Sequence, residues 1–261
     1  MSEPAIIGAQ TLIRGLAVLQ AVADGANSLP RIGQSIGCTR STTQRLVSAL
    51  VERRFLRNGP DHGYALGSKL IELGFRARET VPVTALARRF IAALAARTQD
   101  TVHLGVADGA EVLYIDKIPG QRGLEMRSRV GHRMKLAVTG VGKALMLDMT
   151  PEQRHALHAD ALAHSGARSG LHPWPVYDAE LRAYAASGVA FDLAENEIGI
   201  HCVAAPVRDA GGSIVAAISV ASAAQHMPEA RMRALAPDVA ETAEAISMEL
   251  GWAGPSAKQN Q

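Results

Sequence analysis

The chain has 261 residues, of which 48% are hydrophobic and 20% charged, and its formal net charge is +2. This composition is that of an ordinary globular protein, so a chain that is disordered as a whole is excluded, and the length suffices for one large domain or two smaller ones. No run of about 18 apolar residues is present, which excludes a membrane-spanning helix. An early acid argues against a secretory signal, and two widely spaced cysteines fit a reducing compartment, so we expect a cytoplasmic protein.

The charge is unevenly distributed along the chain. Residues 1–80 carry 10 Lys and Arg against 6 Asp and Glu, a net charge of +4, whereas residues 81–261 carry 17 against 19, a net charge of −2. Between Arg31 and Arg57 there are six arginines and a single acid, Glu52. A local excess of arginine is typical of a surface that contacts phosphates. The N-terminal part is therefore the candidate for nucleic-acid binding.

Three short helices are predicted in this basic part. Apolar residues at helical spacing between Leu12 and Leu19 predict the first, which ends before the turn-forming residues 24–28. Pro30 stands where the first turn of a second helix is expected, a position that tolerates its missing N–H. Gly37 then permits a sharp turn into the third helix.

The third helix is predicted over residues 40–52, with Thr39 as its cap, and it carries two opposite faces. The face expected to point inward consists of Thr43, Leu46, Val47 and Leu50. The other face is polar and rich in hydrogen-bond donors, and it consists of Ser41, Gln44, Arg45 and Ser48. A helix, a glycine turn and a helix with such a face are typical of the helix-turn-helix, whose second helix reaches base edges in the major groove.

Residues 55–57 and 64–66 have β-propensity and flank a turn-rich connector, which predicts a β-hairpin wing after the third helix. For any one of these features a solvated surface is the alternative, but turn, polar face, charge excess and wing occur in the order that a winged helix-turn-helix domain needs. We expect the DNA-binding residues to be Arg31, Arg40, Ser41, Thr42, Gln44, Arg45, Ser48, Arg57 and His62.

From Thr101 onward the sequence consists of short β-prone runs separated by glycine turns. Strands are predicted at residues 102–106, 111–115, 203–207 and 214–220, with a hairpin turn at Asp108-Gly109. Helices are predicted near residues 142–147, 151–157, 178–187 and 228–250. A sheet with helices on its faces is an α+β architecture, and such a domain can enclose a ligand pocket.

Three features of this second part favour a pocket. Gly140-Val141-Gly142 opens a predicted helix, whose N–H groups favour an anion such as a carboxylate. A phosphate-binding loop is excluded, because two positions that its motif requires are alanines here. Asp192 and Cys202 follow as polar or polarisable groups. Finally, Ser219 places a hydroxyl in an otherwise apolar strand, where it needs a partner.

The chain resembles the IclR family of bacterial transcriptional regulators over nearly its whole length. The resemblance is carried by Arg14–Leu19, Arg40–Leu46, Phe55-Leu56, Tyr64–Gly67, Thr101–Leu104, Thr139–Leu145, Gly199–Val207 and Ala217–Val220. It implies a winged helix-turn-helix domain over residues 1–67, a linker helix over 68–81, and a GAF-like α+β effector-binding domain over 82–252. We expect residues 253–261 to be a disordered tail. The resemblance also implies dimers or dimers of dimers.

The same resemblance implies an effector site formed by Met134, Gly140, Val141, Asp192, Cys202 and Ser219, with Leu136, Val138 and Ala221 completing the walls. Ala221 stands where a serine is common and Lys135 where a proline is common, which leaves the identity of the ligand open. A second basic stretch either steers an anion toward the pocket or is an exposed hairpin surface, and it comprises Arg122, Arg127, Arg129, Arg133 and Lys135. We expect the effector to be a small organic acid, such as a sugar acid or an aromatic acid.

An enzyme is the alternative from another class. Cys202 would be its nucleophile, but His201 would point to the opposite face of the strand and could not easily serve as the base. His155 and His158 share a helix side, yet no further ligand completes a metal motif, so a surface pair is expected. A nucleic-acid-binding protein without a sensor is disfavoured by the long α+β part.

We therefore expect a transcriptional regulator and not an enzyme, with no cofactor, no metal and no membrane partner. Its expected partners are a double-stranded DNA operator, a small organic acid and further copies of the chain. It would control catabolic genes, as a repressor or an activator.

Overall fold

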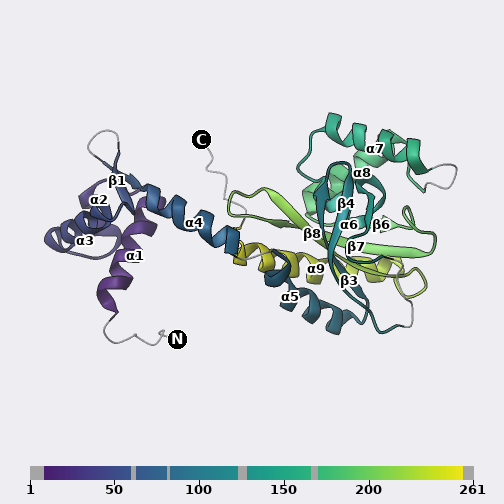
Figure 1. Cartoon of the computed structure of the whole chain (residues 1–261), viewed down its shortest axis with the longest axis horizontal. Coiled ribbons are helices and arrows are strands. Elements are labelled where there is room, and N and C mark those ends of the chain that lie inside the picture. The colour runs from purple at the N-terminus through teal and green to yellow at the C-terminus, as the bar shows by residue number, and fades with distance from the viewer. Residues whose placement is uncertain (1–8, 60–62, 81–82, 123–127, 166–169, 255–261) are drawn as a thin grey trace. The chain divides into compact units, whose positions relative to one another are not determined.

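The computed structural model describes residues 9–59, 63–80, 83–122, 128–165 and 170–254. The chain divides into two compact units, Met1–Thr80 and Val81–Gln261 (Figure 1). Within the described ranges, no helix is long and apolar enough to cross a membrane. Two expectations, His62 at the wing tip and most of the disordered tail, lie outside the described residues.

The N-terminal unit contains the elements that the sequence predicts. In chain order they are α1 (Gln10–Ala23), α2 (Leu29–Ser35), α3 (Arg40–Glu52), β1 (Leu56–Asn58), β2 (Tyr64–Leu66) and α4 (Ser68–Thr80). β1 and β2 pair antiparallel, as a wing requires. The core of the unit gathers residues from α1, α2, α3 and β1, namely Val18, Val22, Ile32, Val47 and Leu56.

Local chemistry at the α2–α3 turn determines where α3 begins. The Thr39 side chain accepts a hydrogen bond from the backbone N–H of Thr42 at 3.4 Å, which caps the helix as predicted. Gly37 has a φ of +61°, a backbone conformation that residues with a side chain rarely adopt. Gly33 of α2 lies so close to α3 that a Cβ there would stand 3.0 Å from the Thr43 hydroxyl. The two helices therefore cross tightly, which orients α3.

The apolar spacing between Leu12 and Leu19 predicts α1 correctly, although two of the residues that carry it are largely exposed. Leu12 and Leu16 are 65% and 57% exposed, and Ile13 beside them is 49% exposed. The buried residues of α1 include Val18 and Val22. Because both sides of this helix carry apolar residues, the periodicity alone does not select one, and a patch of Leu12, Ile13 and Leu16 stays exposed.

The C-terminal unit is built on one antiparallel six-stranded sheet in the order β5-β4-β3-β8-β7-β6. Its strands are β3 (Thr101–Asp108), β4 (Glu111–Ile118), β5 (Arg133–Lys135), β6 (Ala190–Leu193), β7 (Ile200–Arg208) and β8 (Ile214–Ala223). Its helices are α5 (Val83–Thr98), the 3-10 helix η2 (Leu136–Val138), α6 (Gly140–Leu145), α7 (Pro151–Ser165), α8 (Trp174–Ser187) and α9 (Glu229–Glu249).

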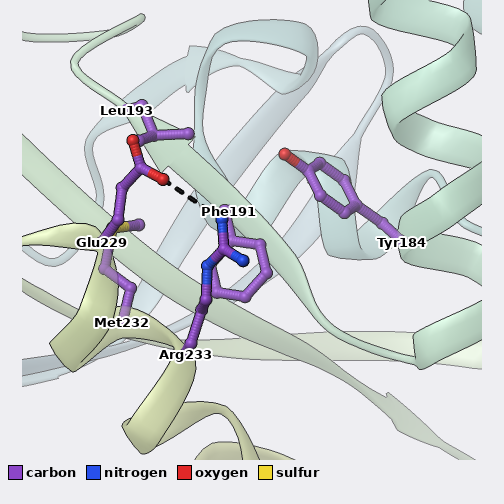
Figure 2. A pocket seen from close by; sticks show the side chains of 6 residues that line it. All are labelled: Tyr184, Phe191, Leu193, Glu229, Met232 and Arg233. Carbon is purple, nitrogen blue, oxygen red and sulfur yellow. Dashed lines mark hydrogen bonds and ion pairs between the residues drawn. The ribbon is translucent and has the colours of Figure 1, made fainter.

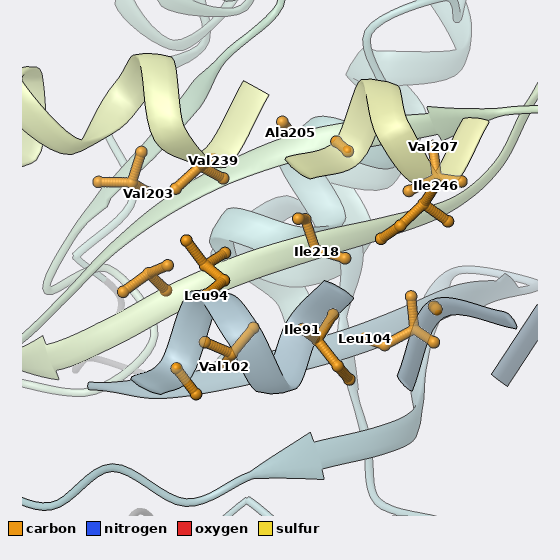
Figure 3. Packing of buried hydrophobic residues seen from close by; sticks show 14 of the residues in the cluster. Ile91, Leu94, Val102, Leu104, Val203, Ala205, Val207, Ile218, Val239 and Ile246 are labelled. Carbon is orange, nitrogen blue, oxygen red and sulfur yellow. The ribbon is translucent and has the colours of Figure 1, made fainter. Parts of the chain in front are cut away.

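The sheet has a core on each face. On one face, α5 and α9 cover alternate residues of the central strands, among them Val102, Val203 and Ile218 (Figure 3). On the other face, η2, α6 and α8 pack over a second cluster that contains Leu136, Tyr177 and other buried residues. The α+β architecture is thus as predicted, while β5 and β6 at the two edges are too short for their pattern to be read from sequence.

Candidate functional site

The predicted DNA-contacting face of α3 is exposed in the structure. Thr43 and Val47 are buried, so the opposite side of the helix is left to solvent. The exposed members of the predicted set are Arg31 on α2, Arg57 on β1, and Arg40, Ser41, Gln44, Arg45 and Ser48 on α3. Thr42 is half-buried, and its hydroxyl accepts a hydrogen bond from the hydroxyl of Thr39 at 3.0 Å. The surface is therefore polar, basic and rich in donors.

Not every arginine of the basic unit contributes equally to this surface. Arg54 has a φ of +62°, and its guanidinium lies 3.4 Å from Glu72 on α4, so its charge is partly neutralised.

Two polar side chains on α3 contact each other. Gln44 donates to the Ser48 hydroxyl at 3.3 Å, one turn along the helix. The contact orders two polar side chains on the same side of the helix as Arg45, and this part of α3 is the candidate for reading bases.

In the C-terminal unit, a polar cluster lies on the sheet face that α6 covers. Asp192 of β6 pairs in register with Cys202 of β7, and Ser219 of β8 pairs with His103 of β3. A Cβ on Gly140 would stand 3.0 Å from the Cβ of Cys202 and 3.6 Å from that of Asp192. The start of α6 therefore packs directly on these two residues, and a side chain at position 140 would require Cys202 to move by a few tenths of an ångström.

Met134 and Val141 belong to the apolar cluster on the same sheet face. The fold thus places all six expected effector residues on one side of the sheet, with Gly140, Asp192 and Cys202 in direct contact. The sequence alone gives no such proximity, since these residues come from strands and a helix that are far apart along the chain.

Burial dominates the electrostatics of the cluster. It raises the pKa of Asp192, opposed by the charge of Lys143 and by the backbone N–H of Glu195, which donates to the Asp192 carboxylate at 2.9 Å. Burial also raises the pKa of the Cys202 thiol well above its usual value, and the neighbouring Asp192 raises it further. Cys202 is therefore a neutral thiol, without the thiolate character that a nucleophile needs.

Three residues of this cluster are absent from the set predicted by sequence: His103, Tyr114 and Thr139. The His103 ring lies 5.1 Å from the Tyr114 ring, and its Nε2 is hydrogen-bonded to the Ser128 hydroxyl at 2.7 Å. Burial raises the pKa of the Tyr114 hydroxyl, and the nearby Cys202 and Asp192 raise it further. Thr139 precedes α6 and accepts from the N–H of Gly142 at 3.0 Å, a capping role that its position before Gly140 does predict.

The buried His103 should make the protein sensitive to acid. Burial, assisted by the charge of Lys117, lowers its pKa from the ordinary 6.5 to about 3. Between these values only the unfolded chain binds a proton here, so the contribution of His103 to stability is present above pH 6.5 and is lost as the pH falls. The loss is about 2 kcal/mol at pH 5. Urea unfolding at pH 7 and pH 5 should show a smaller difference for His103→Gln than for the wild type; equal differences would contradict this.

A buried ion pair lies next to the cluster. The ammonium of Lys143 on α6 bonds the carboxylate of Glu195, and the side chains are 0% and 4% exposed. Lys143 also donates to the backbone carbonyl of Phe191 at 3.1 Å. No local signal in the sequence links Lys143 to Glu195, 52 residues later.

The second basic stretch is largely neutralised by acids. Arg122 bonds Asp100 at 2.9 Å, Arg133 bonds Asp108 at 2.6 Å, and Lys135 lies 3.4 Å from Glu111 and 3.1 Å from Asp160. Arg127 lies outside the described residues, and Arg129 is exposed. These pairs favour the interpretation as an exposed hairpin surface over the steering of an anion.

The expected surface pair of histidines is wrong for His158. Its side chain is buried against Trp174 and Tyr177, and its Nε2 is hydrogen-bonded to the carbonyl of His172 at 2.9 Å. His155 is exposed, and its ring centroid lies 4.7 Å from that of Trp174. Among the residues that the structure describes, no group of three or more His, Cys, Asp or Glu is placed to hold a metal ion.

Comparison with known proteins places both units in one family. Residues 11–60 match the IclR helix-turn-helix domain, and residues 75–248 match the bacterial transcriptional regulator IclR C-terminal domain. The transcriptional regulator XynR of Escherichia coli is 28% identical over 246 residues, which cover 93% of this chain and 98% of XynR.

Solved structures share the fold. The Agobacterium tumefaciens repressor BlcR aligns with a TM-score of 0.78 at 21% identity, covering 94% of this chain and 98% of BlcR. An IclR homologue from Microbacterium hydrocarbonoxydans, solved in complex with 4-hydroxybenzoate, aligns with a TM-score of 0.58 at 23% identity, covering 92% of this chain and 98% of the homologue. The chain is a member of the IclR family of DNA-binding transcriptional regulators.

Proposed function

We propose that this regulator responds to a small organic acid and controls catabolic genes by binding an operator as a dimer or a dimer of dimers. The observation that carries the proposal is the presence, in one chain, of an exposed polar face on α3 and a buried polar cluster on a separate sheet unit. We assign operator contact to the predicted DNA-binding residues and effector contact to the predicted six, with His103 and Tyr114 added. The domain boundaries at residues 67, 81 and 252 and a cytoplasmic location belong to the same proposal.

Self-association is supported by the exposed patch of Leu12, Ile13 and Leu16 on α1. Adjacent large apolar side chains that stay exposed are typical of an interaction surface. A second copy would cover the patch and would present two α3 helices to successive major-groove half-sites. The effector would then shift the populations of DNA-competent and incompetent arrangements through the linker helix.

An acid as effector is supported by the chemistry of the cluster. The 4-hydroxybenzoate complex of the Microbacterium relative gives an example of an aromatic acid as ligand. A carboxylate beside Asp192 would be accepted more readily with Asp192 protonated, and burial already raises the pKa of Asp192. Calorimetry with a panel of sugar acids and aromatic acids tests this; binding of neutral compounds without binding of any acid would contradict it. Sustained turnover of a bound acid would instead indicate an enzyme.

Asp192→Ala should abolish the effector response and leave operator affinity within about twofold of the wild type. The expected reason is that Asp192 contacts the effector but lies outside the DNA-binding unit. The labelled duplex is first selected by the wild-type protein from a random library. Its fluorescence anisotropy is then measured at constant pH as the organic acid that binds in calorimetry is added. Glu241→Ala, which removes an exposed acid from α9, is the control and should respond as the wild type does. An unchanged response of Asp192→Ala would remove Asp192 from the site.

A further inference from the structure

A groove of about 300 Å³ lies at the edge of the sheet formed by β6, between α8 and the first turns of α9 (Figure 2). Its volume is at the lower end of the range for small-molecule sites. The side chains that line it are Tyr184, Phe191, Leu193, Glu229, Met232 and Arg233.

The groove is separate from the polar cluster. Phe191 pairs in register with Val203, whose side chain belongs to the core beneath α9, whereas the next residue, Asp192, faces α6 on the other side of the sheet. None of the residues that line the groove belongs to the proposed effector site. A ligand in the groove would therefore be a second ligand.

The lining combines an apolar wall with a charged rim. Phe191, Leu193 and Met232 form the wall, and the Tyr184 ring meets that of Phe191 edge-on at 5.7 Å. Among the described residues the Tyr184 hydroxyl has no hydrogen-bond partner, and in Figure 2 it points toward the side of the groove where the β6 residues lie. The rim carries one negative and one positive group, exposed to solvent.

The charged pair defines what the groove can recognise. On one side of α9, Glu229 and Arg233 stand one turn apart with Oε2 and Nη2 3.3 Å from each other. A ligand with a single charge could bond only one of these two side chains, and it would have to displace the other from the ion pair. A zwitterion replaces the pair by two new ones, since its ammonium bonds Glu229 and its carboxylate bonds Arg233.

We propose that this groove binds an apolar α-amino acid. Its ammonium and carboxylate lie between Glu229 and Arg233, and its side chain lies against Phe191 and Met232. A ligand of about twelve heavy atoms at an open site is expected to have a Kd on the order of 1 mM.

The test is ligand-observed NMR on the full chain with L-phenylalanine and L-leucine, alongside 3-phenylpropanoate, which lacks the ammonium, and phenethylamine, which lacks the carboxylate. Both amino acids should bind, and the acid and the amine should each bind at least about fivefold more weakly than L-phenylalanine. Equal binding of the three phenyl compounds, or no amino-acid binding up to about 50 mM, would overturn the proposal.

Variants separate this groove from the rest of the protein. Glu229→Gln and Arg233→Gln should each weaken L-phenylalanine binding about fivefold or more, with an unchanged unfolding midpoint. The matched control is Arg89→Gln, because Arg89 also pairs with an exposed glutamate and lies 4.6 Å over a phenylalanine ring, but outside the groove. Asp192→Ala should bind L-phenylalanine as the wild type does. Loss of binding in Asp192→Ala but not in Arg233→Gln would place the ligand in the effector site and overturn the second site, without affecting the proposed function.

Discussion

Lys143→Met should destabilise the C-terminal unit by about 3–5 kcal/mol, because it leaves the buried carboxylate of Glu195 without its cation. Neither side chain has water to replace the lost partner, since they are 0% and 4% exposed. Glu195 is poorly placed to tolerate the loss, as its second oxygen is buried without a hydrogen bond and burial already raises its pKa. The variant also loses the hydrogen bond from Lys143 to the Phe191 carbonyl.

The positions of the two tryptophans allow the stability of the C-terminal unit to be measured by itself. Both tryptophans, Trp174 and Trp252, belong to the C-terminal unit, so urea unfolding followed by tryptophan fluorescence reports on that unit alone. A typical domain is stable by about 5–15 kcal/mol, so the expected loss is large and the experiment is best done near 10 °C. A loss below about 1 kcal/mol would contradict the buried pair.

The double variant Lys143→Met, Glu195→Leu separates the loss of pairing from the loss of packing. Replacing both charges by apolar side chains of similar size removes the unpaired carboxylate, so most of the lost stability should return. A double variant as unstable as Lys143→Met would show that packing around Lys143, whose ammonium lies 5.5 Å from the Tyr177 ring and 5.8 Å from the Tyr184 ring, carries the effect instead.

Local patterns in the sequence sufficed for the DNA-binding unit. The cap at Thr39, the turn at Gly37 and the two faces of α3 each depend on residues a few positions apart, and the structure has all of them. The same kind of pattern predicts that α1 is a helix but does not show which side faces the core, since Leu12 and Leu16 have helical spacing and stay exposed.

The proposed effector site could be predicted from the sequence only in part. Residue chemistry and the family resemblance both pointed to Gly140, Asp192 and Cys202, whereas their contact depends on the register of β6 with β7 and on the packing of α6 against these strands. His103 was missed because its pairing with Ser219 joins β3 to β8, strands separated by more than a hundred residues. A pairing over that distance leaves no trace in hydrophobic periodicity.

Arg45→Ala should weaken operator binding by about 1–3 kcal/mol per half-site, which is roughly five- to 150-fold. Arg45 is exposed on α3, on the side that also carries Gln44 and Ser48, and the helix beneath it is held by the buried Thr43 and Val47. The substitution removes a guanidinium from the surface without disturbing this packing. Its effect should therefore fall on DNA contact and not on folding.

The nature of the loss distinguishes a base contact from a phosphate contact. If Arg45 reads a base, anisotropy should show a large loss on the selected duplex and a small loss on a scrambled duplex. If it neutralises a phosphate, both affinities fall alike and the slope of log K against log salt decreases by about one. We expect the first result, since Arg45 shares its face of α3 with the polar side chains of Gln44 and Ser48, and this is the face that we propose enters the groove.

The matched control removes the same charge from the other unit. Arg182 on α8 is 67% exposed and pairs with Asp178, so Arg182→Ala should leave operator affinity unchanged. Effector binding by Arg45→Ala should equal that of the wild type. If Arg45→Ala lost operator and effector binding equally, the defect would be one of folding. If it lost neither, α3 would contact DNA through residues other than Arg45, and the assignment of Arg45 as a reading residue would be wrong.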